Sequence, residues 1–113
     1  MQCTQKGKTL YIKLEGEIDH HSVQGFRKGI ETAFGPTDCR QMIFDFGGVT
    51  FMDSSGIGMI IGRYKDVKKR GGTVSIARMN PEISRIFQIS GLAKIIDNYA
   101  TVEEAEEALG SNG

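Results

Sequence analysis

The chain has no tryptophan, only two prolines and only two cysteines among its 113 residues. Cys3 and Cys39 lie far apart and neither belongs to a Cys-x-x-Cys pair, so we interpret both as free thiols. Two histidines and two scattered cysteines give no recognisable set of zinc ligands. A chain of this length can bury one hydrophobic core without a disulfide or a metal, so neither is expected here.

The sequence also has no excess of either charge and no long hydrophobic run. Fourteen basic residues balance 14 acidic ones, which disfavours DNA, RNA or an anionic membrane as partner. The longest apolar runs, such as residues 59–61, fall far short of the roughly 20 residues that a membrane span needs. The polar start of the chain has no signal-peptide pattern. We therefore expect a cytoplasmic protein, one domain over residues 1–113, and a monomer when free.

Hydrophobic periodicity divides the chain into alternating strands and helices. Strands are predicted at residues 10–15, 42–46, 73–77 and 94–97, and helices at 23–34, 57–70, 81–90 and 102–109. Gly47 and Gly48 are interpreted as a break after the second strand, and Asp19 or Ser22 as the cap of the first helix. The alternation predicts an α/β domain with a mixed, mainly parallel sheet.

One segment, Asp53-Ser54-Ser55-Gly56, lies where a strand passes into the longest helix. The unpaired N–H groups of a first helical turn, together with the helix dipole, form a site for an anion. A phosphate on a serine at this point would meet those donors. The alternative is that the serine only caps the helix, since Asp and Ser are the preferred capping residues.

Glycine, at 15 residues, is the one residue type in excess, and two glycines fall within this helix. Ser54, Gly58 and Gly62 recur every four residues and therefore share one face of the helix. Ser55, Met59 and Arg63 are expected beside that face. The face is predicted to meet solvent or a partner that approaches closely; the alternative is that its glycines pack under a neighbouring loop.

Other chemistries find less support in the sequence. Ser54 is not framed as Gly-x-Ser-x-Gly, so a hydrolase elbow is absent, and His20 or His21 would be needed as a base. No P-loop motif occurs. The glycines at 56, 58 and 62 miss a Gly-x-Gly-x-x-Gly motif by one residue, which leaves weak nucleotide binding as an alternative.

Four segments together resemble the STAS family, the sulfate-transporter and anti-sigma-antagonist domains. Residues 51–58 (FMDSSGIG) resemble its signature, and three further segments resemble the anti-sigma F factor antagonists of spore-forming bacteria: 16–21 (GEIDHH), 62–65 (GRYK), and 90–92 (SGL) followed by 94–96 (KII). The resemblance covers nearly the whole chain. It implies a small sheet of four to five strands with about four helices around it, in a single STAS domain.

The resemblance further implies a regulatory protein without catalytic residues or a cofactor of its own. In that family the unmodified protein binds an anti-sigma factor that is also a serine kinase, and the sigma factor is released. The kinase, which carries ATP or ADP and magnesium, then uses ATP to phosphorylate the first serine after the aspartate, here Ser54, which ends the binding. A serine phosphatase reverses the step. The implied partner-binding residues are Asp19, Asp53, Ser55, Gly56, Ile57, Gly58 and Gly62. Sporulation is the implied pathway, with a general-stress pathway as the alternative.

Overall fold

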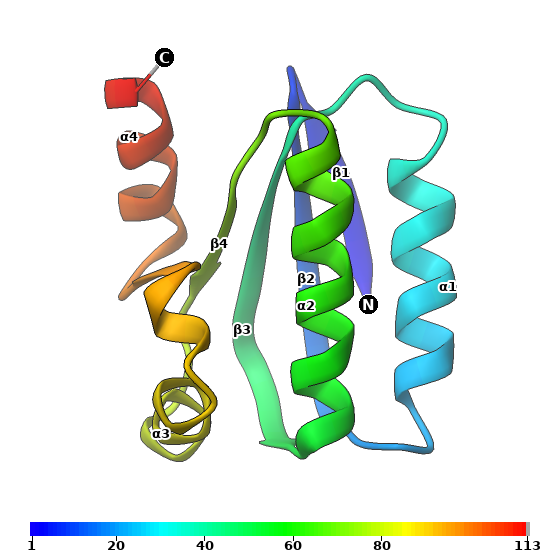
Figure 1. The fold of residues 1–113 in the computed structure, drawn as a ribbon, viewed down its shortest axis with the longest axis vertical. Helices are drawn as coiled ribbons and strands as arrows, with labels where there is room; N and C mark the ends of the chain where they lie inside the picture. Colours follow the sequence, from blue (N-terminus) through cyan, green and yellow to red (C-terminus); the bar gives the residue numbers. More distant parts are fainter. Residues whose placement is uncertain (113) are drawn as a thin grey trace.

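The fold is built from five strands and four α-helices that alternate along most of the chain (Figure 1). A computed structural model describes residues 1–112. The elements are β1 (Gln2–Lys6), β2 (Thr9–Ile18), α1 (Val23–Phe34), β3 (Gln41–Met52), α2 (Ser54–Lys69), β4 (Val74–Ala77), α3 (Pro81–Ile89), the 3-10 turn η1 (Leu92–Lys94), β5 (Asp97–Tyr99) and α4 (Val102–Asn112). The predicted α/β class is confirmed.

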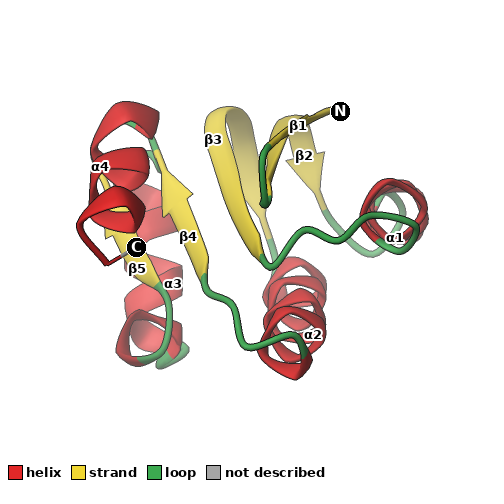
Figure 2. Ribbon diagram, turned by 90° about the horizontal axis from the view of Figure 1, so that it is seen from above, coloured by secondary structure: helices red, strands yellow, loops and turns green. Residues whose placement is uncertain are grey.

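The five strands form one sheet in the order β1-β2-β3-β4-β5, and helices cover both of its faces. Only β1 runs antiparallel to its neighbour; the other pairs are parallel, as predicted. Figure 2 shows α1, α2 and α3 on one face and α4 on the other. Within residues 1–112, none of the helices is long and apolar enough to span a membrane.

The main core lies between the sheet and α1, α2 and α3. Alternate residues of β2, Leu10, Ile12 and Leu14, point into it and are almost fully buried. On β3, Phe44 faces this core, while its neighbour Ile43 is buried on the other side of the sheet, where α4 packs against β3, β4 and β5. Burial on both faces explains why the middle of β3 is a continuous apolar run.

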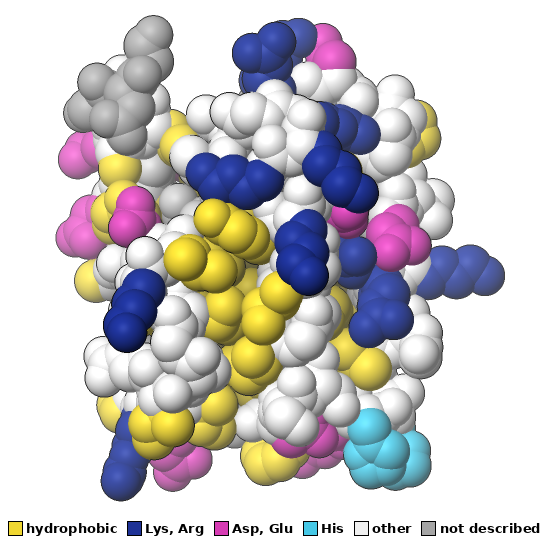
Figure 3. Space-filling model, viewed as in Figure 1, with side chains coloured by type: hydrophobic (Ala, Val, Ile, Leu, Met, Phe, Trp, Pro, Cys, Tyr) yellow, Lys and Arg dark blue, Asp and Glu magenta, His cyan; other side chains and the backbone are white. Residues whose placement is uncertain are grey.

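Charge is distributed unevenly over the molecule although it sums to zero. The first two turns of α4 carry four glutamates and no basic residue. Figure 3 shows acidic side chains at α4 and mostly basic ones over the end of α2 and the segment beside it. The protein therefore presents an acidic α4 on one side of the sheet and basic α2 residues on the other.

Three predictions about the strands are wrong. The expected strand at 94–97 begins only at Asp97, because Gly91, with φ +84°, starts a 3-10 turn that Ile95 and Ile96 close by donating N–H bonds to Leu92 O. The Gly47–Gly48 pair does not interrupt β3, which continues to Met52 through two shifts of its register with β2. The first strand, β1, was not predicted, because its polar sequence shows no alternation.

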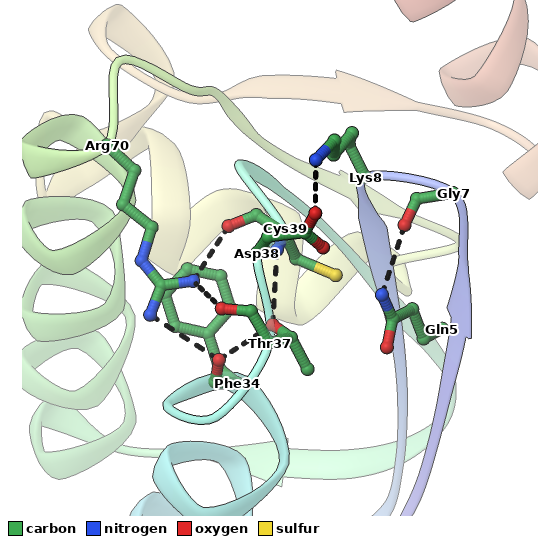
Figure 4. A network of polar contacts seen from close by, with 8 residues as sticks. All are labelled: Gln5, Gly7, Lys8, Phe34, Thr37, Asp38, Cys39 and Arg70. Atoms are coloured by element: carbon green, nitrogen blue, oxygen red, sulfur yellow. Dashed lines mark hydrogen bonds and ion pairs between the residues drawn. The ribbon is translucent and has the colours of Figure 1, made fainter.

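Arg70, at the end of α2, holds the end of α1 and the loop that follows it (Figure 4). Its Nη1 donates to the carbonyls of Cys39 and Thr37, at 2.8 and 3.0 Å, and its Nη2 donates to those of Gly35 and Phe34, at 3.2 and 3.4 Å. The guanidinium also lies 3.8 Å from the centre of the Phe34 ring. One side chain thus satisfies carbonyls that the end of a helix leaves unpaired.

We predict that Arg70→Met lowers the free energy of unfolding by about 2 kcal/mol, because it removes charge-assisted hydrogen bonds to several carbonyls at once. Arg70→Lys should recover less than half of the loss, since an ammonium cannot reproduce the planar fork. Urea denaturation followed by circular dichroism measures both variants, with Lys69→Met, at an exposed neighbour, as control. A loss below about 0.5 kcal/mol for Arg70→Met would contradict the role of this network.

Candidate functional site

The candidate site is the start of α2, directly after β3. Asp53 is the cap of the helix: its Oδ1 accepts a hydrogen bond of 2.8 Å from the Ser55 N–H. Ser54 is exposed, and its hydroxyl has no hydrogen-bond partner among the described residues. The interpretation that Ser54 only caps the helix is therefore wrong, because Asp53 performs that role and leaves the Ser54 hydroxyl accessible.

The turn between β2 and α1 lies beside this helix start. The Asp53 N–H donates a 3.1 Å hydrogen bond to Ile18 O, which brings Asp19, the next residue after Ile18, close in space to the cap of α2. The Asp19 carboxylate accepts bonds of 2.9 Å from the N–H groups of both His21 and Ser22. The Ser22 backbone bond, helped by that of His21, lowers the pKa of Asp19 and outweighs the opposite effect of desolvation. Asp19 thus places a fixed negative charge near the start of α2.

Ser54, Gly58 and Gly62 form what we call the glycine strip on the outer face of α2. Ser54 and Gly58 are exposed, and Gly62 is half-buried. A Cβ atom added to either glycine would meet no neighbouring atom within 4 Å. The glycines therefore do not pack under a loop, and the strip is open to an approaching surface.

Gly56, which the resemblance implies as a partner-binding residue, is not part of this exposed surface. It is buried, and a Cβ atom there would lie 2.4 Å from Met52 Cγ and 3.0 Å from Ile18 Cγ2. The glycine at 56 lets the first turn of α2 pack tightly on the ends of β2 and β3. Ser55 and Ile57 are half-buried, and Ile57 packs against the core.

Met59 and Arg63 were expected beside the glycine strip, but they are 0% and 6% exposed. Arg63 Nη2 donates to Glu31 of α1 at 3.1 Å, and its Nε donates to Asp66 at 3.2 Å. The burial of Arg63 could be predicted from the sequence, because Arg63 follows Ser54 by nine residues and therefore lies half a revolution away from it around the helix. The structure therefore places Arg63 between α1 and α2.

The geometry gives no support to the alternative chemistries. The rings of His20 and His21 lie 3.9 Å apart and contact each other, and no hydrogen bond joins either of them to a serine hydroxyl in the described residues. No group of three potential metal ligands occurs within residues 1–112. The hollow of about 310 Å³ between β1, β2 and α4 is lined by residues remote from Ser54. Since Gly56 is buried, residues 56–62 do not form an open glycine loop for a nucleotide.

Comparison with known sequences gives one consistent family. The model of the STAS domain matches residues 1–105. An anti-sigma F factor antagonist from Paenibacillus polymyxa is 37% identical over 90 residues, which are 80% of this chain and 77% of that protein. An anti-sigma-B factor antagonist from Bacillus subtilis (strain 168) is 35% identical over 88% of this chain and 89% of that protein.

Solved structures agree with the sequences. The anti-sigma factor antagonist SpoIIAA in its unphosphorylated form superposes with a TM-score of 0.84 at 33% identity, over 97% of this chain and 96% of that one. The phosphorylated form of SpoIIAA, a Bacillus cell fate determinant, gives 0.74 at 34% identity, over 96% and 97% of the two chains. The chain therefore belongs to the STAS domain family, which it shares with these anti-sigma factor antagonists.

Proposed function

We propose that this protein is an anti-sigma factor antagonist of the F or B type, switched by phosphorylation of Ser54. The observation that carries the proposal is the state of Ser54: an exposed hydroxyl without a hydrogen bond, on the first residue of α2, beside an open glycine strip. The likeness to relatives of both types supports it. The protein acts as a regulator and not as an enzyme.

In the unmodified state, the glycine strip and its surroundings dock on an anti-sigma factor that is also a serine kinase. Gly58 and Gly62 let the partner approach the backbone of α2, since no side chain stands above them. Asp19, Asp53, Ser55 and Ile57 border the strip and complete the docking surface. Gly56 contributes indirectly, by allowing the first turn of α2 to pack where it does.

Phosphorylation changes the charge at this surface by about −1.5 to −2 at neutral pH. In the free protein the N–H groups of the first turn of α2 and the helix dipole stabilise that charge. In the complex the phosphate would lose water and lie near the carboxylates of Asp19 and Asp53, which repel it. The modification therefore weakens the complex more than it disturbs the free protein.

The catalytic groups of the transfer belong to the partners. The kinase supplies the base, the magnesium and the ATP, and Ser54 supplies only the accepting hydroxyl. A serine phosphatase restores the unmodified form. We place the protein in the cytoplasm as a monomeric STAS domain over residues 1–113, and among the two pathways we favour sporulation, because the segments GEIDHH and GRYK follow the F-type pattern.

We predict that Ser54→Ala binds the anti-sigma kinase within about threefold of the wild type but accepts no phosphate. Ser54→Asp should bind at least about tenfold more weakly, because it introduces a charge at the centre of the docking surface. Calorimetric titration with ADP present measures the affinity, and mass spectrometry after incubation with ATP locates the phosphate. Thr32→Asp, which adds the same charge at an exposed position of α1, is the control. Equal affinities for Ser54→Asp and wild type, or phosphate on another residue, would refute the proposal.

A second prediction tests the close approach at Gly58. Gly58→Ala should stabilise the free protein by about 0.5–1 kcal/mol, since alanine is the better helix former and the added methyl meets nothing. The same change should weaken docking about tenfold, because the methyl enters the space that the partner occupies.

Gly25→Ala is the matched control for that experiment, because Gly25 lies in α1 and a Cβ atom there also meets no atom within 4 Å. It should raise the unfolding free energy to a similar extent and leave the affinity unchanged. If both alanine variants kept wild-type affinity, the partner would not approach α2 closely at Gly58.

The anti-sigma factor that the protein binds more tightly distinguishes the F type from the B type. We predict that the protein binds an anti-sigma F factor at least about tenfold more tightly than an anti-sigma B factor, when both are measured with ADP under the same salt concentration. The two kinases serve as controls for each other in this titration. Tighter binding to the anti-sigma B factor would assign the protein to the stress-response type.

A further inference from the structure

Three isoleucines on α3 and the following turn are exposed, in a chain whose other apolar residues are mostly buried. Ile86, Ile89 and Ile95 are 36%, 76% and 49% exposed. Ile86 and Ile89 are three residues apart on α3 and therefore share one face of that helix. We call these three residues the isoleucine patch. Exposed apolar groups that lie together mark an interaction surface more often than isolated ones.

The patch continues onto α2. Arg63 and Asp66 lie on the flank of α2 toward α1, where Arg63 meets Glu31. Ile57 and Ile61 lie on the opposite flank, toward α3, and are only half-buried. Figure 3 shows a band of hydrophobic side chains between α2 and the α3–η1 segment. Ile57 is also three residues from Ser54, so the apolar surface begins beside the glycine strip.

The charges around the patch are mostly basic. Between Ile83 and Ile96 the only charged residues are Arg85 and Lys94. On α2, Lys65 is exposed and Lys68 lies over the ring of Tyr64. The acids that flank this segment in the chain are Glu82, in the first turn of α3, and Asp97, at the start of β5, and on α2 Asp66 is paired with Arg63. The complementary partner is therefore apolar at its centre and acidic at its edges.

We infer that the isoleucine patch, with Ile57 and Ile61, binds an amphipathic helix of the anti-sigma kinase that carries acidic residues along its borders. This inference rests on the proposed function and enlarges its docking surface from the glycine strip to the space between α2 and α3. An apolar helix face set against a preformed apolar surface is a common mode of peptide recognition. A phosphate on Ser54 would stand at one end of this surface and repel the acidic helix.

The experiment compares Ile89→Asp with Gln88→Asp in calorimetric titrations with the anti-sigma kinase and ADP. Both residues are exposed on α3, so both variants add the same charge, but only the first removes a side chain of the patch. We expect at least a tenfold loss of affinity for Ile89→Asp and less than a twofold change for Gln88→Asp. Ile89→Ser, which adds no charge, is the second variant and should lose at least threefold.

Charge complementarity is tested by association rates at low and high salt. Arg85→Glu should lower the association rate constant at least threefold at low salt, with the difference decreasing as salt screens the charges. Glu104→Lys, on α4 across the sheet, should leave the rate within twofold. An unchanged rate for Arg85→Glu would overturn the assignment of an acidic partner.

Ser54→Asp separates failure of this inference from failure of the proposed function. If Ser54→Asp weakens binding while Ile89→Asp and Ile89→Ser bind like the wild type, the patch is not part of the docking surface and the proposed function stands. If the wild type does not bind the kinase, both fail. Two further results would overturn the choice of occupant: a concentration-dependent dimer in sedimentation that Ile89→Asp abolishes, or flotation with vesicles of 30% anionic lipid that Ile89→Asp abolishes.

Discussion

Two arginines of α2 fix that helix against α1, and the surface around Ser54 depends on the position that they set. Arg63 joins the second half of α2 to the last turn of α1 through Glu31, and Arg70 binds four carbonyls at the end of α1 and in its loop. At the other end, the Asp53 N–H bonds to Ile18 O. The turn that carries Asp19 is thus bonded directly to the start of α2, and the end of α1 is bonded to α2 at two further places, so that the proposed docking surface exists before a partner arrives.

Each side of α2 meets a different environment, and its residue types follow from that. The side toward the sheet carries Ile60 and Val67, both fully buried, and the side toward α1 carries the Arg63 ion pairs. The outer side carries glycines, which weaken a helix when nothing offsets their cost. The sheet and α1 stabilise α2 from two directions, and this support allows the open glycine strip to persist.

Periodicity predicted the helices and the central strands well, because burial against the sheet imposes a regular pattern on them. It did not predict β1 or the start of β5, where backbone pairing with a neighbouring strand, and not side-chain burial, determines the structure. At the site, the exposed Ser54 and the open Gly58 followed from helical spacing. The buried Gly56 did not, because its role depends on Met52 and Ile18, which lie in other elements. Helical spacing places Arg63 opposite Ser54, but it does not identify its partner Glu31, which lies in α1.

The exposed position of Ser54, the proposed phosphorylation site, determines how a switch at this residue would work. Ser54 is accessible and its helix is already capped by Asp53, so a phosphate can be added without unfolding the first turn. The unphosphorylated and phosphorylated forms of SpoIIAA both share this fold, with TM-scores of 0.84 and 0.74. A modification can shift a binding equilibrium only through a difference in interaction between the free and bound states. In the proposed switch that difference arises at the interface: the helix dipole favours the phosphate in water, whereas Asp19 and Asp53 would oppose it once a partner excludes the water.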